Sequence, residues 1–506
     1  MDEVKLPQGW ALTTIGKICT KLQYGYTATA SVERCGPRFL RITDIQDGAV
    51  AWPTVPYCEI DSKQAEKYLV CDGDIVFART GGTVGKSYVI NSVPEPSVFA
   101  SYLIRLSAHA EVDPNYLYYF FQSPSYWEQI GLKKGGLQGN VNATSLASLA
   151  VPICSLNEQR RIVVKIEELF SELDKGIESL KIAQAQLKVY RQALFKNAFE
   201  GKLTAHWRMA NPEKLKASNA LLIDTQQERT QRYHHELAEW QASGKQGLKP
   251  RIPKALPAVT VDELAGLPEL PTGWTWTRLG NTNSDVFDGP FGSNLKSSDY
   301  VADGVRVIRL ENIGALEFIE NKESYITQEK YELLKGHTVS GGDIIFSSFI
   351  TENIRVALLP KGITKAVNKA DCFCVRSFGQ TLNTEYLVTF LSTRHVFKQL
   401  EAKIHGVGRP RINTTQLKDV FIPICSPDEQ LAVISEIDSR LSQAAQLEQT
   451  LSSALLRSEA LRGSILIKAF RGQLVPQHPT DEPASALLTR INAESSAKLP
   501  GKKARK

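Results

Sequence analysis

The feature that most constrains this chain is a long segment that occurs twice. The first copy, Pro152 to Leu203, begins PICSLNEQ and ends AFEGKL, and the second copy, Pro423 to Leu474, begins PICSPDEQ and ends AFRGQL. The two copies are offset by 271 residues at both ends, so neither has gained or lost a residue relative to the other. A segment that keeps its length so strictly is typical of a rigid element.

The hydrophobic pattern of the first copy predicts a long amphipathic helix. Its apolar stripe has a strict seven-residue spacing, and charged side chains lie mainly off that stripe; the stripe residues are Ile166, Leu173, Leu180, Leu187 and Leu194. This spacing is typical of a coiled coil. About 45 residues at about 1.5 Å each predict a rod of about 65 to 70 Å. Because a single rod would expose its apolar seam to water, we expect the two copies to pack on each other.

The flanking sequence repeats as well, in the same order. Leu6 to Cys19, LPQGWALTTIGKIC, is matched by Leu270 to Thr282, LPTGWTWTRLGNT, at an offset of 264 residues. FLRITDI then matches VIRLENI, GDIVFART matches GDIIFSSF, and NYLYYFFQS matches EYLVTFLST. Since the offset drifts up to 271 residues, the core elements have kept their order while the loops have changed length. This pattern predicts two homologous domains.

Short β-branched runs such as Phe99 to Leu106, together with helix-like segments, predict mixed α/β domains in an α+β chain with a pseudo-twofold internal repeat. Two long antiparallel coiled-coil helices are expected to separate them. The predicted segments are domain 1 (residues 1–154), a first long helix and following helical region (155–240), a Pro/Gly/Lys linker (241–268), domain 2 (269–425), a second long helix and following helix (426–495) and a basic tail (496–506).

Composition indicates a soluble globular protein of 506 residues with 42% hydrophobic and 23% charged residues. A net charge of +6 allows an acidic partner without requiring one. The sequence has no apolar run of about 18 residues and no signal peptide at its N-terminus. Eight cysteines without a CxxC pair are typical of a reducing compartment, so we expect a cytoplasmic location.

A search for catalytic motifs finds none that holds. Gly81 to Ser87, GGTVGKS, differs from a phosphate-binding loop because Thr80 stands where glycine is required and a strand-like SYVI follows. Asp113 to Tyr116, DPNY, is one residue from the DPPY box of amino-group methyltransferases, but aspartate and proline before an aromatic run also begin ordinary helices. No GxGxxG or HExxH motif is present, and no nucleophile or metal site is evident.

Both domains carry polar loops in which basic, amide and glycine residues gather. Arginine and lysine suit guanine and phosphate, asparagine and glutamine suit adenine, and glycine lets a backbone approach DNA closely. The candidate DNA contacts are Arg79, Thr80, Gly82, Lys86, Lys133, Lys134, Gln138 and Asn140 in domain 1, and Ser293, Asn294, Lys296, Ser347, Ser348, Asn353, Arg355, Arg409 and Arg411 in domain 2. The alternative is that these are solvated loops around a β core.

Arg41 and Arg309 are equivalent residues embedded in strand-like runs. Each is a candidate phosphate contact. Pairing with a neighbour such as Asp44 is an equally good interpretation.

The motifs LPxGW, GDIVFARTGGTVGKS, GPFGSNLKSSDY, PxxEQ before a long helix, and FEGKLTAHWR after it closely resemble the specificity (S) subunits of type I restriction-modification systems. The resemblance covers nearly the whole chain. It implies two target-recognition domains that each read one half of a bipartite, asymmetric DNA site, with the paired helices as a spacer. It also implies a subunit without a catalytic centre.

In that family the subunit recruits two methyltransferase (M) subunits, which methylate adenine with S-adenosylmethionine, and two restriction (R) subunits, which use ATP and Mg²⁺. By analogy, the partner-binding residues lie at the helix ends: Glu158, Gln159, Phe199, Gly201, Glu429, Gln430, Phe470 and Gly472. Helix capping is the alternative for the two Glu-Gln pairs.

Two other classes of function stay open from the residues alone. A coiled-coil scaffold without DNA recognition would bind its partners with little salt dependence, whereas DNA binding weakens steeply as salt rises. An enzyme would need an unrecognised methyltransferase or nuclease centre.

Overall fold

The computed structural model of the chain describes residues 6–46, 48–80, 84–134, 141–247, 249–351, 353–378, 380–404 and 410–497. It forms two compact units, Met1–Ile182 with Leu451–Lys506 (unit 1) and Ala183–Thr450 (unit 2). Within the described residues no helix is both long enough and apolar enough to cross a membrane.

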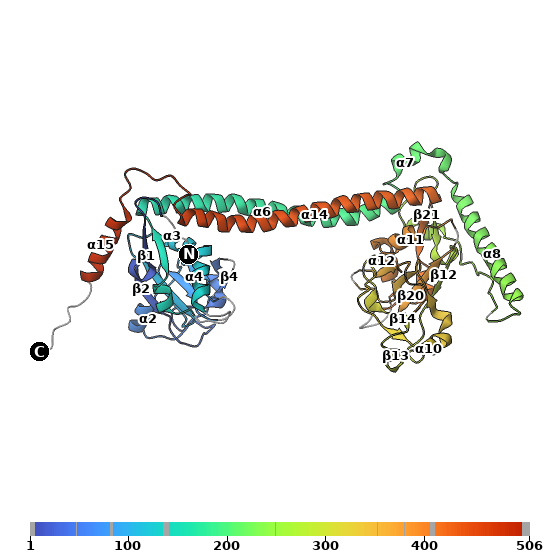
Figure 1. Cartoon of the computed structure of the whole chain (residues 1–506), viewed down its shortest axis with the longest axis horizontal. Coiled ribbons are helices and arrows are strands. Elements are labelled where there is room, and N and C mark those ends of the chain that lie inside the picture. Colours follow the sequence, from blue (N-terminus) through green and yellow to red (C-terminus); the bar gives the residue numbers. More distant parts are fainter. Residues whose placement is uncertain are drawn as a thin grey trace. The chain divides into compact units, whose positions relative to one another are not determined.

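Two 44-residue helices, α6 (Leu156–Phe199) and α14 (Pro427–Phe470), contribute to both units. They lie side by side within each unit (Figure 1). In unit 1 Asp174 pairs with Arg462, and in unit 2 Arg191 pairs with Glu448 at 2.8 Å, so residue numbers rise along one helix as they fall along the other. The predicted antiparallel pair is therefore present.

The heptad stripe of α6 is buried most deeply at its two ends. Ile166 and Leu194, at the two ends of the stripe, are buried, whereas Leu173, Leu180 and Leu187 in the middle are half-buried. Ile166 is part of the unit 1 core, and just beyond Leu194 the helix enters the unit 2 core through Ala198 and Phe199.

The domain 1 part of unit 1 is built on a four-stranded antiparallel sheet in the order β2-β9-β6-β7. The strands are β2 (Cys19–Tyr24), β9 (Leu103–Ala108), β6 (Ile75–Ala78) and β7 (Ser87–Val89). All four residues of β6, IVFA, are buried, as expected for a strand covered on both faces. A separate parallel pair joins β3 (Arg38–Leu40) to β8 (Ser97–Phe99), and β1 (Ala11–Thr14) pairs with β10 (Ala150–Ile153).

Domain 1 also contains five α-helices among the described residues: α1 (Ile15–Ile18), α2 (Ser62–Tyr68), α3 (Pro114–Phe120), α4 (Pro124–Lys134) and α5 (Ala143–Ala147). Asp113 is the N-cap of α3 and accepts the amides of Asn115 and Tyr116 at 2.9 and 3.3 Å, which confirms the helix-start interpretation of DPNY. The prediction of one strand over Phe99 to Leu106 was wrong, because a turn at Ser101 and Tyr102 separates β8 from β9.

The domain 2 part of unit 2 repeats the four-stranded order as β12-β20-β17-β18. These strands are β12 (Ser284–Phe287), β20 (Cys372–Ser377), β17 (Ile344–Ser347) and β18 (Val356–Leu358). A five-stranded sheet has the order β13 (Tyr300–Val301), β15 (Tyr325–Ile326), β14 (Val305–Ile308), β19 (Ala366–Asn368) and β16 (Thr338–Val339). Within it β14 and β19 are parallel, as β3 and β8 are in domain 1.

The remaining elements of unit 2 are helices and one further strand pair. They are β11 (Thr275–Arg278) with β21 (Phe421–Ile424), and α7 (Ala205–Ala210), α8 (Ser218–Ala242), α9 (Val261–Ala265), α10 (Gln328–Leu333), α11 (Thr384–Leu391), α12 (Arg394–Glu401) and α13 (Thr414–Lys418). The segment expected to be a linker thus contains the short helix α9.

Each domain core includes the C-terminal end of one long helix, and this is the helix that follows the other domain in the sequence. In unit 1 the core includes Ala469 and Phe470 from the end of α14, and Leu487 from α15 (Ala484–Ala497). In unit 2 it includes Ala198 and Phe199 from the end of α6. Burial of these side chains anchors the C-terminal end of each long helix.

Candidate nucleic-acid interface

In unit 1, the start of α6 is held to domain 1 by two buried polar side chains. Glu158 is 3% exposed and accepts the indole N–H of Trp10 at 3.1 Å. Gln159 is fully buried, accepts the amide of Asp113 at 2.9 Å and donates to the carbonyl of Cys154 at 2.9 Å. Burial raises the pKa of Glu158 above its usual value.

In unit 2, the start of α14 repeats this arrangement with one change. Gln430 accepts the amide of Asn383 at 2.8 Å and donates to the carbonyl of Cys425 at 2.9 Å. Glu429 is 1% exposed, but its Oε1 accepts the guanidinium of Arg208 at 2.5 Å and the hydroxyl of Thr204 at 2.7 Å. At the start of α14, a salt bridge with Arg208 therefore takes the place of the indole hydrogen bond at the start of α6.

The far ends of the helices insert aromatic side chains into the domains. Phe470 packs edge to face on Tyr116, with ring centroids 5.1 Å apart, and Phe199 packs likewise on Tyr386 at 5.1 Å. Just beyond each helix, Gly201 and Gly472 have φ of +69° and +67°, and an added Cβ would lie 2.5 Å from a proline side chain. Both glycines are therefore required by conformation and by space.

These contacts give the residues of the predicted partner-binding set a role within this chain. The side chains of Glu158, Gln159, Phe199, Glu429, Gln430 and Phe470 are buried against this chain's own domains, and Gly201 and Gly472 form the turns that follow. A partner could reach them only by breaking these contacts. They are joints between helix and domain, which we call the α6 joint (Glu158, Gln159) and the α14 joint (Glu429, Gln430).

In domain 1, the loop that connects β6 to β7 begins with Arg79. Its guanidinium carbon lies 4.9 Å from the ring centroid of Tyr24, and its buried Nε has no hydrogen-bond partner among the described residues. The phenol of Tyr24 is fixed because it accepts the amide of Ala143 at 3.1 Å. Thr80 is half-buried, and Lys86 at the other end of the loop is exposed.

In domain 2, the equivalent loop between β17 and β18 begins with buried serines. The Ser348 hydroxyl donates to Asp371 at 3.0 Å, and the Ser347 hydroxyl accepts Arg355 at 3.3 Å. Arg355 also donates to the carbonyl of Leu310 at 3.2 Å. Because both serines are at most 1% exposed, their predicted role as base-reading side chains does not fit this structure.

Arg411 lies beside this loop of domain 2. Its guanidinium is 3.4 Å from Asp371 and 4.5 Å from the ring centroid of Phe349, while half of its side chain is exposed. Sequence reasoning named Arg411 but missed Asp371, whose φ of +71° is rare for a residue with a side chain. It also missed Tyr24 and the exposed Tyr102, since neither lies in a basic or glycine-rich run.

The equivalent arginines Arg41 and Arg309 are both paired with protein groups. Arg41 forks onto Asp44 at 2.8 and 3.1 Å, which raises the pKa of Arg41. Arg309 lies 2.9 Å from Glu311. The structure thus shows the neighbour pairing that the sequence left as an alternative to a phosphate contact.

The other candidate contacts fall into two groups. The first group is exposed and consists of Ser293, Asn294, Lys296 and Asn353. Among the described residues, no side-chain hydrogen bond links this group to Asp371, Ser348 or Arg411. Gly82, Gln138, Asn140 and Arg409 lie outside the described residues, as do the side chains of Lys133 and Lys134 at the end of α4.

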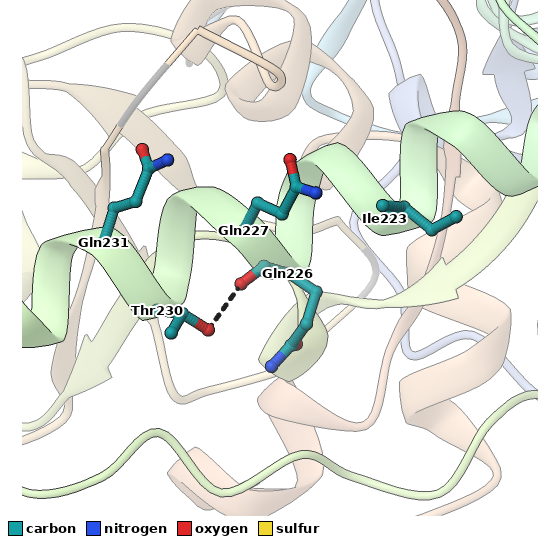
Figure 2. Close-up of a pocket in the computed structure, with 5 residues that line it drawn as sticks. All are labelled: Ile223, Gln226, Gln227, Thr230 and Gln231. Atoms are coloured by element: carbon teal, nitrogen blue, oxygen red, sulfur yellow. Dashed lines mark hydrogen bonds between the residues drawn. The ribbon is translucent and has the colours of Figure 1, made fainter.

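No enclosed cofactor site emerges from the described part of the chain. Figure 2 shows a shallow hollow lined by one face of α8, where the Thr230 hydroxyl donates to the carbonyl of Gln226 at 2.9 Å. Its lining residues are Ile223, Gln226, Gln227, Thr230 and Gln231. Among the described residues no group of three or more His, Cys, Asp or Glu side chains could hold a metal ion.

Comparison with known proteins agrees with this architecture. Residues 7–182 match the model of the type I restriction modification DNA specificity domain. The chain is 23% identical over its whole length to the whole of the type I restriction enzyme StySPI specificity subunit of Salmonella potsdam. It is also 23% identical to the EcoBI specificity subunit of Escherichia coli, over 77% of this chain and 74% of that protein.

Two solved structures share the fold. One is a chain from a study of complex assembly and conformational transition of the type I R-M system, with a TM-score of 0.59 and 18% identity over 93% of this chain and 99% of that one. The other is the HsdS subunit of Thermoanaerobacter tengcongensis, with a TM-score of 0.55, 18% identity and the same coverage.

Proposed function

We infer that this chain acts as the specificity subunit of a type I restriction-modification system, the family to which it belongs, and that it is the non-catalytic, DNA-recognising member of its complex. We propose that its two domains are homologous target-recognition domains related by a pseudo-twofold axis. Each would read one half of a bipartite, asymmetric site.

One observation carries the asymmetric part of this proposal. The same strand order, β2-β9-β6-β7 and β12-β20-β17-β18, presents different side chains at the same sheet edge: Arg79 in one domain, and Asp371, held by the buried Ser348, in the other. A shared scaffold with different polar groups can read different base sequences, because specificity lies in the base-edge contacts.

The partners follow from the family. We propose that two methyltransferase subunits and two restriction subunits assemble on this chain in the cytoplasm, and that S-adenosylmethionine, ATP and Mg²⁺ bind to those subunits. The length of α6 and α14 would set the number of base pairs between the half-sites.

The joints are buried, so the methyltransferase subunits need another surface. The long helices expose several large apolar side chains. Val164 and Leu456 are 63% and 69% exposed in unit 1, and Val189 and Leu447 are 65% and 57% exposed in unit 2. We propose that one methyltransferase subunit contacts the helix pair in each unit. Native mass spectrometry of a Val164→Lys, Leu456→Lys variant should show one bound methyltransferase subunit where the unchanged chain shows two, and a Glu168→Lys control should retain both.

The test of the function is methylation mapping by single-molecule sequencing. DNA from cells that express the chain with its neighbouring methyltransferase is compared with DNA from cells that express the methyltransferase alone. Methylated adenines in a split, asymmetric motif that depends on this chain support the proposal. A stable complex between the two proteins without a new motif would overturn it and favour a scaffold.

A further inference from the structure

We propose that the two domains read opposite hydrogen-bonding patterns from the same sheet edge: Arg79 recognises a guanine in one half-site, and Asp371 recognises a cytosine in the other. The proposal rests on the function inferred above and names the side chains that set specificity.

The two residues lie on corresponding strand-end pairs of their domains, Arg79 at the end of one strand of its pair and Asp371 at the start of the other strand of its pair. In domain 1 the amide of Arg79, which follows β6, donates to the carbonyl of Tyr102 at 3.0 Å. In domain 2 the amide of Ser348, which follows β17, donates to the carbonyl of Asp371 at 2.9 Å. Since β6 pairs with β9 as β17 pairs with β20, the pair Arg79 and Tyr102 corresponds to the pair Ser348 and Asp371.

Arg79 differs from the other arginines of domain 1. Arg34 and Arg38 pair with Glu95, Arg41 pairs with Asp44, and Arg105 lies 3.6 Å from Asp74. Among the described residues, no carboxylate pairs with Arg79 and no hydrogen bond satisfies its buried Nε. Within the described part of the chain, Arg79 is therefore the arginine of domain 1 that remains available to bind an external hydrogen-bond acceptor.

The setting of Arg79 favours a base over a phosphate. Its guanidinium rests on the ring of Tyr24, which is fixed by the Ala143 amide, and Tyr102 beside it is 59% exposed. A stacked guanidinium presents its donors as a planar fork, which matches O6 and N7 of guanine. The exposed, flexible Lys86 at the other end of the loop suits a phosphate better.

Asp371 presents an acceptor at the equivalent sheet edge, at the start of the strand that corresponds to that of Tyr102. Its amide donates to Asp288 at 3.1 Å, and its Oδ1 accepts the Ser348 hydroxyl at 3.0 Å. These bonds hold a backbone conformation with φ of +71°, which few side-chain-bearing residues adopt. Oδ2 has no hydrogen-bond partner among the described residues, and 27% of the side chain is exposed. The carboxylate is thus fixed with one oxygen free.

A carboxylate selects for an amino group and against acceptors. Cytosine N4 is a major-groove donor without an adjacent acceptor, whereas adenine carries N7 beside N6 and guanine offers only O6 and N7. Arg411, 3.4 Å from Oδ1, offsets part of the negative charge of the carboxylate in a site that must approach a polyanion. Cytosine is therefore the base that fits Asp371.

The experiment compares methylation motifs of the whole methyltransferase complex carrying Arg79→Lys, Asp371→Asn or the unchanged chain. Arg79→Lys keeps the charge but loses the fork, and Asp371→Asn keeps the shape but loses the charge. Each should reduce discrimination roughly 5- to 150-fold at one G·C pair, in a different half-site for each variant. The other positions of the motif should stay as they are.

Two controls separate the alternatives. Arg34→Gln changes an exposed arginine outside the proposed surface and should leave motif and rate unchanged. Lys86→Gln should slow methylation of all sites without altering the motif. For Arg79→Lys, an equal loss of methylation at all sites would show a phosphate contact and overturn the guanine assignment. An unchanged motif for this variant would overturn it too. For Asp371→Asn, an unchanged motif would overturn the cytosine assignment. Failure of the function itself looks different, because the unchanged chain would then give no split motif.

Discussion

The α6 joint and the α14 joint solve the same packing problem with different charges. In both, a glutamine binds the amide that begins a short domain helix, at 2.9 and 2.8 Å, and a tyrosine hydroxyl donates to a proline carbonyl, at 2.9 and 3.0 Å. The neighbouring glutamates differ: Glu158 meets the indole of Trp10, whereas Glu429 meets Arg208. Buried acceptors must be satisfied, but the donor that satisfies them can change.

The largest expected effect tests the shared part of the joints, the aromatic anchors. Phe199→Ala and Phe470→Ala each remove a buried ring and should cost about 3 to 5 kcal/mol. Phe199→Ala should destabilise domain 2 although its helix follows domain 1, and Phe470→Ala should destabilise domain 1. Hydrogen exchange followed by mass spectrometry assigns the loss of protection to a domain. Equal loss in both domains for either variant would contradict this assignment of the anchors.

The next largest loss of stability should distinguish the α14 joint from the α6 joint. Glu429→Gln leaves Arg208 buried without its charge partner and should cost about 3 kcal/mol in domain 2. Glu158→Gln keeps an acceptor for the Trp10 indole, so we expect less than about 1 kcal/mol in domain 1. Thermal unfolding of the two variants measures the difference, and similar losses would show that the two joints do not differ in kind.

A smaller loss of stability, caused by changes at the two glycines that follow the long helices, should be about equal in the two units. Gly201→Ala and Gly472→Ala each place a side chain at positive φ and against a proline, and should cost about 1 to 3 kcal/mol. Gly176→Ala in the middle of α6, where an added Cβ meets no atom within 4 Å, is the matched control and should stabilise the helix slightly. Denaturant midpoints of the three variants provide the measurement.

The smallest effect is a pH dependence confined to the α6 joint. Burial raises the pKa of Glu158, so the folded protein binds this proton more tightly than the unfolded chain does. The contribution of Glu158 to stability is therefore present at low pH and is lost as pH rises through the raised pKa. Glu158→Gln should remove this slope in the pH range above the ordinary pKa of a glutamate side chain, as followed by urea unfolding of domain 1. A slope that persists in the variant would assign the effect to another group.

The sequence predicted the two long helices well because these rest on local periodicity and on an internal repeat. The heptad stripe that ends at Leu194 and the helix cap at Asp113 are properties of neighbouring residues. The joints could not be predicted in this way. Glu158 is buried by Trp10, 148 residues away, and a polar residue at a helix start is usually exposed.

The candidate interface was predicted in part for the same reason. Loop composition identified Arg79 and Arg411, but it could not show that Ser347 and Ser348 face inward. Asp371 carries no local signal, since its role depends on a positive φ and on contacts with Asp288 and Ser348 across the domain. Side-chain direction in loops is set by such distant contacts.

The exchange of helix ends has a consequence for the order in which the chain can fold during translation. Domain 1 leaves the ribosome first, yet its core needs Phe470 and Leu487, which are made near the end of synthesis. Domain 2 needs nothing beyond Ile437 and its neighbours and can close earlier. The first domain to be made is therefore the last to be completed, and until then the apolar seam of α6 is a natural substrate for a chaperone.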